Sequence, residues 1–322
     1  MKVLVTGSAG YVGSTLVPLL LDNGHSVRGL DILAHGGKSQ LGFWSHPKFE
    51  FLRGDVREAE AIRRAVAGVD AVVHLAAIVG DPACARQPDV AKAVNLEASL
   101  RLLEASQKAG CSRFTFASTC SNYGRMKDPT QYVTEESELS PISLYAETKV
   151  TVEKTLLDPA KTQGLCATAL RFSTVHGVAP RMRFDLTVNE FTMKMIREKK
   201  LVVFGEQFWR PYIHVRDAAR ALALVLEQPE SKVRNAVFNV GCTDQNYQKQ
   251  QIVELIRPHV PDARIEYVKK DEDPRDYRVS FEKIRGELGF EITRTVRDGI
   301  GEIAQLVRDG LLSDYENPEY RN

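Results

Sequence analysis

The sequence predicts an α/β protein with a doubly wound parallel sheet, followed by a smaller, mostly α C-terminal substrate domain. Three observations predict this class. An apolar, β-branched run at Lys2–Thr6 leads directly into a glycine-rich turn and a helix. Short apolar strands then alternate with helical segments, and polar runs follow the strand ends. Strands that alternate with helices at this pitch need right-handed crossovers, so they lie parallel in one sheet.

The first unit is a strand, a glycine-rich turn, the helix Ser14–Asp22 and a second strand that ends at Asp31. Gly7, Gly10 and Gly13 give the spacing G-x-x-G-x-x-G. Such glycines let a pyrophosphate approach the backbone, and the helix N-terminus offers unpaired N–H groups. Asp31 can accept hydrogen bonds from both hydroxyls of an adenosine ribose and would repel a 2′-phosphate. The unit therefore predicts NAD rather than NADP.

The later elements follow from the same patterns. His35–Lys48 is irregular, and we expect it to arch over the adenosine end. Asp55 follows the third strand and has two readings, a contact to adenine or a cap for the next helix. Arg197–Lys200 reads as a solvated helix end, and Tyr315–Asn322 as a loose polar tail. The other predicted strands are Phe49–Leu52, Asp70–Leu75, Arg113–Ala117 and Val237–Gly241. The other predicted helices are Glu58–Ala67, Pro88–Ala109, Ser143–Leu157, Ala218–Glu227, Gln250–His259 and Glu291–Arg308.

Composition limits the function classes. The 322 residues carry a formal net charge of +1, which gives no sign of a nucleic-acid partner. The five cysteines are dispersed without a C-x-x-C pair, which favours reduced cytosolic thiols over disulfides or a zinc site. The first strand begins at residue 2 and leaves no room for a signal peptide. No stretch is apolar enough to span a membrane, so we expect a cytoplasmic protein without bound metal.

The chemistry is predicted where the fifth strand ends, because ligands of doubly wound sheets bind at carboxyl ends of strands. A polar run, Ser118–Gly124, stands there, and the next helix carries Tyr145 and Lys149 on one face. A free phenol has a pKa of about 10, and a nearby ammonium is expected to lower it. Tyr145 could then take a proton from a substrate hydroxyl while hydride leaves for NAD. Thr119 would position the same oxygen, and Lys149 can also hold the nicotinamide ribose.

These motifs resemble the extended short-chain dehydrogenase/reductase family, in its nucleotide-sugar epimerase/dehydratase group. The resemblance covers essentially the whole chain and rests on T-G-x-x-G-x-x-G at Thr6–Gly13, the two aspartates, S-T-x-x-x-Y-G at Ser118–Gly124 and Y-x-x-x-K at Tyr145–Lys149. It implies a Rossmann domain of residues 1–172 with 211–241, and a substrate domain of residues 173–210 and 242–322. It also implies the catalytic set Thr119, Tyr145 and Lys149, and a homodimer formed through helices Pro88–Ala109 and Ser143–Leu157.

Two sets of binding residues are predicted. The cofactor set follows the glycine-rich turn, the strand ends and the catalytic pair: Gly7, Gly10, Tyr11, Val12, Gly13, Asp31, Asp55, Val56, Leu75, Ala76, Ala77, Asn95, Ser118, Tyr145 and Lys149. The substrate set for a nucleotide diphosphate sugar is Thr119, Cys120, Ser121, Thr174, Arg181, Arg183, Asn189, Arg210, Arg275 and Arg278. Arg210 matches the family arginine that grips the diphosphate. Thr174 and His176 stand where the family has Asn and Tyr, and His214 reads as structural.

Departures from the family motifs narrow the reaction. Relatives that eliminate water across C5–C6 carry Asp-Glu directly after the catalytic Thr, where this chain has Cys120 and Ser121. We therefore expect no 4,6-dehydration, and a 4-epimerase is the leading prediction. The alternative is a heptose or deoxysugar 4-dehydrogenase or 4-ketoreductase, indicated by Ala76–Pro82, Pro180–Asp185 and Pro274–Tyr277. A non-nucleotide alcohol dehydrogenase and a silent NAD-binding sensor also stay open.

Cys120 has two readings, a weak acid or a small buried thiol. Asp81 and Glu136 border the predicted pocket, and either could supply a carboxylate. The sequence alone leaves these alternatives open.

Overall fold

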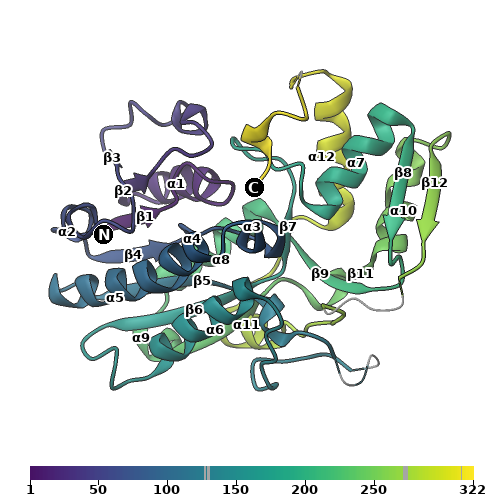
Figure 1. Ribbon diagram of the computed structural model, residues 1–322. Coiled ribbons are helices and arrows are strands. Elements are labelled where there is room, and N and C mark those ends of the chain that lie inside the picture. The colour runs from purple at the N-terminus through teal and green to yellow at the C-terminus, as the bar shows by residue number, and fades with distance from the viewer. Residues whose placement is uncertain (127, 129–130, 271–274, 313) are drawn as a thin grey trace.

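The computed structural model describes residues 1–126, 128, 131–270, 275–312 and 314–322. Its centre is a parallel seven-stranded sheet in the order β10-β6-β5-β4-β1-β2-β3 (Figure 1). The order reverses between β1 and β4, which is the point where such sheets bind ligands. The strands are β1 Lys2–Thr6, β2 Ser26–Asp31, β3 Phe49–Arg53, β4 Ala71–His74, β5 Arg113–Thr119, β6 Cys166–Phe172 and β10 Ala236–Val240. The predicted doubly wound sheet is confirmed.

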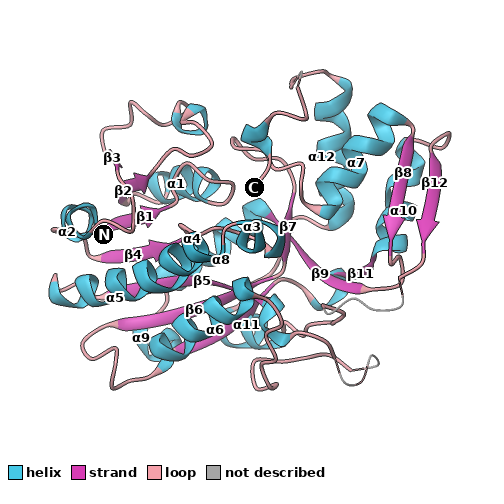
Figure 2. Cartoon of the chain, viewed as in Figure 1, coloured by secondary structure: helices cyan, strands magenta, loops and turns pink. Residues whose placement is uncertain are grey.

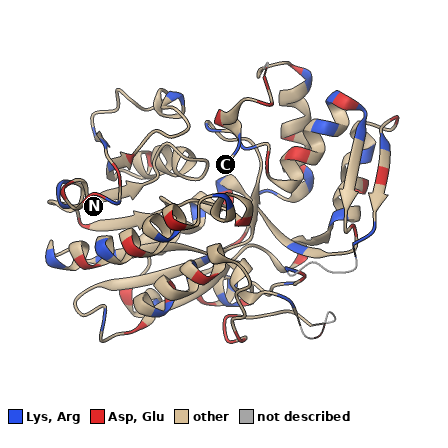
Figure 3. Cartoon of the chain, in the orientation of Figure 1, with Lys and Arg blue, Asp and Glu red and all other residues tan. Residues whose placement is uncertain are grey.

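Helices cover both faces of this sheet (Figure 2). Alternate β1 residues face opposite layers: Val3 and Val5 pack with one group of helices and Leu4 with the other. The first layer contains α1 Gly13–Asp22, α8 Val215–Glu227, α9 Glu230–Val233 and α11 Glu282–Leu288. The second contains α2 Ala59–Val66, α5 Ser99–Lys108 and α6 Leu144–Leu157. The outer helices carry charged residues of both signs (Figure 3).

A second core lies beside the large sheet, around α7 Thr187–Glu198, α10 Lys249–Ile256 and α12 Val296–Arg308. Five short strands that the sequence analysis did not predict accompany these helices, in the small sheets β11-β9-β7 and β12-β8. They are β7 Thr174–His176, β8 Lys200–Phe204, β9 Trp209–His214, β11 Asn246–Gln248 and β12 Arg264–Val268. Each is only three to six residues long, so its periodicity is too short to recognise.

The long helix predicted at Pro88–Ala109 has three parts. Pro88–Lys92 is α4, Ala93–Ala98 forms a π-helical turn, and α5 follows. A short helix, α3 Asp81–Arg86, precedes them and was not predicted. Turns of 3-10 helix complete the described elements at Lys38–Gln40, Cys120–Tyr123, Thr243–Gln245, Arg257–His259 and Pro318–Tyr320.

Two predictions for the C-terminal part are wrong. The helix predicted from Glu291 begins at Val296, because the Asp217 carboxylate accepts the backbone N–H groups of Thr293 and Arg294 and holds them outside the helix. The predicted loose tail is docked. The Tyr315 side chain is buried against Phe184, and the Tyr320 carbonyl accepts the Phe184 N–H.

Within the described part of the chain, every helix is too short or too polar to cross a bilayer. The same residues contain no cluster of three His, Cys, Asp or Glu side chains placed to hold a metal ion.

Candidate active site

The glycine-rich turn sits at the strand reversal and is packed too tightly for side chains. Gly7 has a φ of +73°, and its N–H donates to the Leu30 carbonyl at 2.8 Å. A Cβ on Gly13 would lie 2.1 Å from the Gly7 carbonyl oxygen. A Cβ on Gly7 would lie 2.9 Å from the Ala76 nitrogen. The N-terminus of α1 therefore meets the ends of β1 and β4 through bare backbone, which is the arrangement that a dinucleotide needs.

The Asp31 carboxylate is oriented by this turn. It accepts hydrogen bonds from the Ala9 N–H at 3.0 Å and the Leu33 N–H at 2.7 Å, and burial raises its pKa. Asp55 is used differently. Its carboxylate pairs with the Arg57 guanidinium at 2.5 Å and accepts the Arg57 N–H at 2.8 Å. The N-cap position of α2 is Glu58, whose side chain makes no capping hydrogen bond, so Asp55 is not the N-cap residue. Val56 is buried in the core on the α2 side.

Polar residues brace the loop that follows β4. The Asn95 amide, in the π-helical turn, bonds both the N–H and the carbonyl of Ile78. The Thr6 hydroxyl accepts the Leu75 and Ala76 N–H groups and contacts His74 Nδ1 at 2.7 Å. Sequence reasoning predicted Asn95 and missed Thr6 and His74, although a π turn commonly marks a functional site. The loop beside Ala76 and Ala77 is therefore held in one conformation.

The predicted catalytic pair lies on α6, facing the end of β5. Lys149 is 3% exposed, and its Nζ donates to the Ala117 carbonyl at 2.8 Å. The same nitrogen lies 5.9 Å from the centre of the Tyr145 ring. Ser143 caps the helix and donates a hydrogen bond of 2.7 Å to Asp81. Burial lowers the pKa of Lys149 to about 8. The structure thus brings Tyr145, Lys149 and Asp81 into one corner of the cleft.

The protein alone does not lower the pKa of Tyr145, contrary to the prediction from sequence. Burial raises the pKa of this phenol above its usual value, and the nearby Cys84 and Asp81 raise it further. Arg183 is the neighbour that opposes them. Deprotonation of Tyr145 therefore needs positive charge beyond what this corner supplies.

Side chains after β5 divide between the cleft and the interior. Thr119 Oγ1 accepts the Ser121 N–H at 3.1 Å, and the Ser121 hydroxyl lies 3.4 Å from that of Tyr277. Ser118 instead donates to Glu153 at 2.6 Å inside a buried network. Cys120 is 1% exposed, donates to the Arg171 carbonyl, and has its thiol pKa raised by burial. Both side chains point inward, so the predicted ligand contacts of Ser118 and Cys120, which stay predictions, would have to use their backbone groups.

Three of the predicted arginines gather on the substrate side. The Arg210 guanidinium donates to the Trp209 and Arg275 carbonyls and lies 5.6 Å from the Tyr277 ring. Arg275 pairs with Asp81 at 3.1 Å, which joins this group to the catalytic corner. Arg278 lies over the Trp209 ring at 5.0 Å. The motif residue Pro274 lies outside the described residues.

The other predicted substrate residues are built into the scaffold. Asn189 is fully buried, and its amide bonds Gly177, the Arg183 carbonyl and the Tyr11 hydroxyl. Tyr11 also donates to the Gly177 carbonyl at 2.6 Å. These two side chains join the glycine-rich turn to the loop after β7, and the ligand contacts predicted for Tyr11 and Asn189 stay predictions.

The remaining three occupy other places. Arg183 pairs with Asp185 at 2.7 Å. Arg181 donates to Asn322 and to the Arg321 carbonyl. Thr174 opens β7 and pairs with Tyr212 of β9. In the part of the chain that the structure describes, none of the three forms a hydrogen bond or ion pair with Tyr145 or Thr119, though Arg183 acts on Tyr145 through its charge.

Known proteins share this arrangement. The model of the NAD dependent epimerase/dehydratase family matches residues 3–241. The UDP-glucose 4-epimerase of Corynebacterium glutamicum is 30% identical over 308 residues, with 90% of each chain covered. The dTDP-glucose 4,6-dehydratase of Streptomyces griseus is 29% identical over 308 residues, covering 92% of this chain and 91% of its own.

Solved structures agree with these sequences. The Thermotoga maritima UDP-glucose 4-epimerase with UDP-glucose has a TM-score of 0.85 and 28% identity, covering 97% of this chain and all of its own. The Thermus thermophilus UDP-glucose 4-epimerase complex with NAD has a TM-score of 0.81 and 26% identity, covering 96% and 99%. With its glycine-rich turn, its Tyr145–Lys149 pair and these relatives, the chain belongs to the NAD dependent epimerase/dehydratase family of extended short-chain dehydrogenases/reductases.

Proposed function

We propose that this protein is an NAD-dependent nucleotide-sugar 4-epimerase that removes hydride from the sugar C4 with Tyr145 as the base. The observation that carries the proposal is the catalytic corner itself. Tyr145 and Lys149 on α6 face the end of β5, where Thr119 keeps a hydroxyl in the cleft. Arg275 reaches the same corner through Asp81 and supplies charge for a diphosphate.

The residues present fit NAD. Asp31 is fixed for a ribose by two backbone N–H groups, and the turn of Gly7 and Gly13 leaves bare backbone at the start of α1. Lys149 Nζ lies between the Ala117 carbonyl and the Tyr145 ring, where it can hold the second ribose. When bound, NAD accepts a hydride from the sugar carbon and can return it to either face of the ketone.

The chain's own residues handle the proton. Tyr145 accepts the proton of the C4 hydroxyl as the C–H bond breaks and gives it back when hydride returns, so no proton is gained or lost. Thr119 donates a hydrogen bond that orients the same oxygen. Because burial raises the pKa of Tyr145, its phenolate must be stabilised by Lys149, Arg183 and the positive charge of the oxidised cofactor.

Dehydration is not proposed, although dehydratases are among the relatives. The two positions after Thr119 carry no carboxyl group, and Cys120 is buried with a raised thiol pKa. Asp81 is the carboxylate beside Tyr145, but it is held by Ser143 and Arg275. The alternative function is a heptose or deoxysugar 4-dehydrogenase or 4-ketoreductase, which needs the same first step and differs in releasing the reduced cofactor.

We also propose the organisation that goes with this activity. Residues 1–172 with 211–241 bind the cofactor, and residues 173–210 with 242–322 bind the sugar nucleotide. Two copies would pair through Pro88–Ala109, which comprises α4, the π-helical turn and α5, and through α6 as a homodimer. Size-exclusion chromatography with light scattering tests this pairing, and a monomeric mass would contradict it.

Product analysis tests the reaction. The NAD-loaded protein is incubated with UDP-, dTDP- and GDP-hexoses in deuterated water, and the sugars are read by proton NMR. We expect inversion at C4 without deuterium uptake at C3 or C5. Stoichiometric release of reduced cofactor would favour the 4-dehydrogenase alternative. A lack of turnover with every sugar nucleotide, together with oxidation of a simple alcohol, would contradict a nucleotide-sugar substrate.

A further inference from the structure

A second concave surface lies away from the catalytic side chains. A pocket of about 870 Å³ opens between α1, the first turns of α8, the end of α12 and the residues Leu311, Leu312, Glu319 and Tyr320. None of the predicted cofactor residues lines it, and Arg181 is the one predicted substrate residue among its lining residues. The pocket is therefore separate from the cleft in which the reaction is proposed.

The walls of this pocket suit an organic ligand. Its volume falls in the range of small-molecule sites, which are mostly apolar with a few placed polar groups. The apolar part is formed by Pro18, Leu19, Met182, Leu306, Leu312 and Tyr320. His35 also lines the pocket and adds a second flat ring to its wall. Burial, reinforced by Arg181 and Arg183, lowers the pKa of His35 to about 4, so this ring is uncharged at neutral pH.

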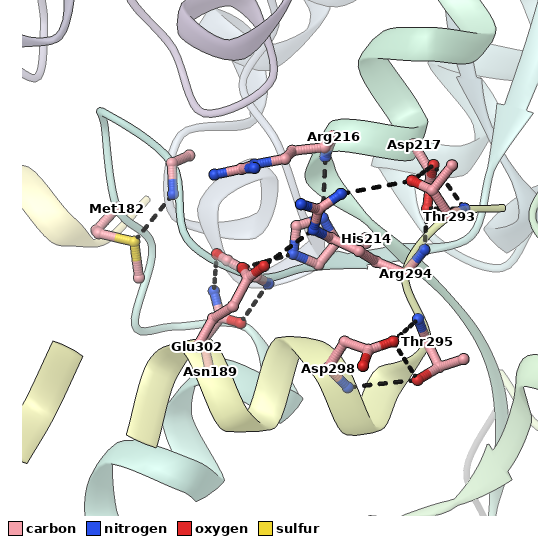
Figure 4. A network of polar contacts seen from close by, with 12 residues as sticks. Met182, Asn189, His214, Arg216, Asp217, Thr293, Arg294, Thr295, Asp298 and Glu302 are labelled. Atoms are coloured by element: carbon pink, nitrogen blue, oxygen red, sulfur yellow. Dashed lines mark hydrogen bonds and ion pairs between the residues drawn. The ribbon is translucent and has the colours of Figure 1, made fainter. Parts of the chain in front are cut away.

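Four arginines line the pocket together with Lys38, Asp22 and Glu319, and Lys38 pairs with Glu319 at 3.4 Å. Two of the arginines are also neutralised. Arg220 pairs with Asp217 at 2.6 Å, and Arg294 pairs with Glu302 at 3.0 Å. Arg216 is exposed, and its guanidinium makes no hydrogen bond or ion pair with any residue that the structure describes. Figure 4 shows this side chain extending away from the network that joins the other groups. Arg216 is thus a cation available to a ligand.

Arg181 is the second cation, and it is buried without a carboxylate partner. It is 5% exposed and donates only to neutral acceptors, the Arg321 carbonyl at 3.0 Å and Asn322 Oδ1 at 2.8 Å. Its Nε is buried and has no hydrogen-bond partner among the described residues. Burial, followed by the charge of Arg183, lowers its pKa to about 10. A buried cation of this kind is costly unless an anion meets it.

We propose that this pocket is a second binding site, for a nucleoside mono- or diphosphate, with its phosphate on Arg181 and Arg216 and its base against Tyr320 and His35. Phosphate is the anion that guanidinium groups bind best through paired hydrogen bonds. Flat apolar rings suit a nucleobase.

Such a ligand would touch both cores of the molecule. Ser14 and Thr15, in the first turn of α1, line the pocket, and the Arg181 N–H contacts Ser14 Oγ at 3.4 Å. The helix that begins at the predicted pyrophosphate site is therefore in contact with the second site. Occupancy of the pocket would change the affinity for the cofactor, and the cofactor would change that of the pocket by the same factor.

Isothermal titration calorimetry of the NAD-loaded protein with UDP, dTDP, GDP and AMP tests the proposal. We expect a site for at least one nucleotide that Arg216→Glu weakens by tenfold or more. Arg285→Glu, which reverses an equally exposed arginine on α11, should leave that site unchanged. Arg216→Gln removes the charge without reversing it and serves if the first variant does not fold.

The outcomes separate this pocket from the proposed reaction. For a nucleotide that also enters the catalytic cleft, the stoichiometry should fall from two sites per chain to one in Arg216→Glu. Sugar turnover should be retained in this variant. Unchanged affinity and stoichiometry in both Arg216 variants would overturn the second site and leave the epimerase proposal intact. If none of the four nucleotides binds, the proposal of the second site is overturned as well. Nucleotide binding that depends on Arg216, in a protein that turns over no sugar nucleotide, would support the second site and contradict the proposed reaction.

Discussion

The cofactor side and the substrate side of the cleft hold their polar groups in different ways. Asp31 is oriented by Ala9, 22 residues away, and by Leu33 next to it. Arg210 is held by a carbonyl 65 residues away, and Arg181 by a side chain 141 residues away. Motifs therefore predict the cofactor side well. On the substrate side, a side chain at the expected motif position can contact either a ligand or the rest of the protein. The motif alone does not tell which of the two it contacts.

The largest expected effect tests the packing of the cofactor side. Gly13→Ala would place a methyl group against the Gly7 carbonyl, so the turn must move and NAD binding should fall by at least about 100-fold. Gly301→Ala in α12, where a Cβ meets open space, is the matched control and should raise stability by about 0.5–1 kcal/mol. NAD titration and thermal unfolding check both variants. Retention of normal NAD affinity in Gly13→Ala would contradict the tight turn.

Two arginines allow a direct comparison between a residue that stabilises the fold and a residue that is proposed to bind the substrate. Arg171 is paired with Glu153, and both side chains are at most 4% exposed, whereas Arg275 is 39% exposed beside Asp81. Arg171→Met leaves a buried carboxylate alone and should cost about 3–5 kcal/mol in urea unfolding. Arg275→Met should cost under about 1 kcal/mol. It should instead raise KM for the sugar nucleotide about tenfold, the size of one charge-assisted hydrogen bond. Equal stability losses would remove the distinction.

Low pH should weaken both regions together. Burial lowers the pKa of His74, and also that of His176 on the other side, to about 3. Between about pH 6.5 and 3 the unfolded chain holds more protons on these rings than the folded one. Each histidine should therefore remove up to about 1.4 kcal/mol of stability for each pH unit of acidification in that window. His176→Asn should reduce the slope of urea stability against pH, and an unchanged slope would contradict a neutral buried ring.

The smallest effect concerns the thiol next to Thr119. Because Cys120 is buried with a raised pKa, Cys120→Ala should change kcat by less than about threefold and leave its pH profile in place. Iodoacetamide should label the partly exposed Cys242 well before Cys120. A large fall in kcat, or rapid labelling of Cys120 in the folded protein, would show that this thiol takes part in the reaction.

Much of the fold follows from local patterns. The strands of the large sheet, the glycine-rich turn and α6 are visible as apolar runs, glycine spacing and helical periodicity. The start of α12 is not, because Asp217 holds Thr293 from 76 residues away. The docking of Tyr315 on Phe184 likewise depends on packing between distant segments.

The site is predictable to a similar degree. Thr119 lies at the end of β5, and Tyr145 and Lys149 lie on α6, as the motifs indicate, but the direction of each side chain is not predictable from them. Ser118 and Cys120 turn inward because β5 runs on to Thr119, two residues beyond the predicted end, and alternate residues of a strand face opposite sides. Asn189 reads as a ligand in the sequence and is a buried link in the structure, since its partners Tyr11 and Gly177 come from elsewhere in the chain.

The central claim is that Tyr145 takes the proton while hydride leaves the sugar. Stopped-flow absorbance at the wavelength of reduced nicotinamide, after mixing NAD-loaded protein with the accepted sugar nucleotide, tests it most directly. Tyr145→Phe should slow cofactor reduction by about 10²–10⁴-fold, with the substrate Kd and the thermal unfolding temperature close to those of the unaltered protein. Reduction at an undiminished rate in this variant would show that another group is the base and would contradict the account.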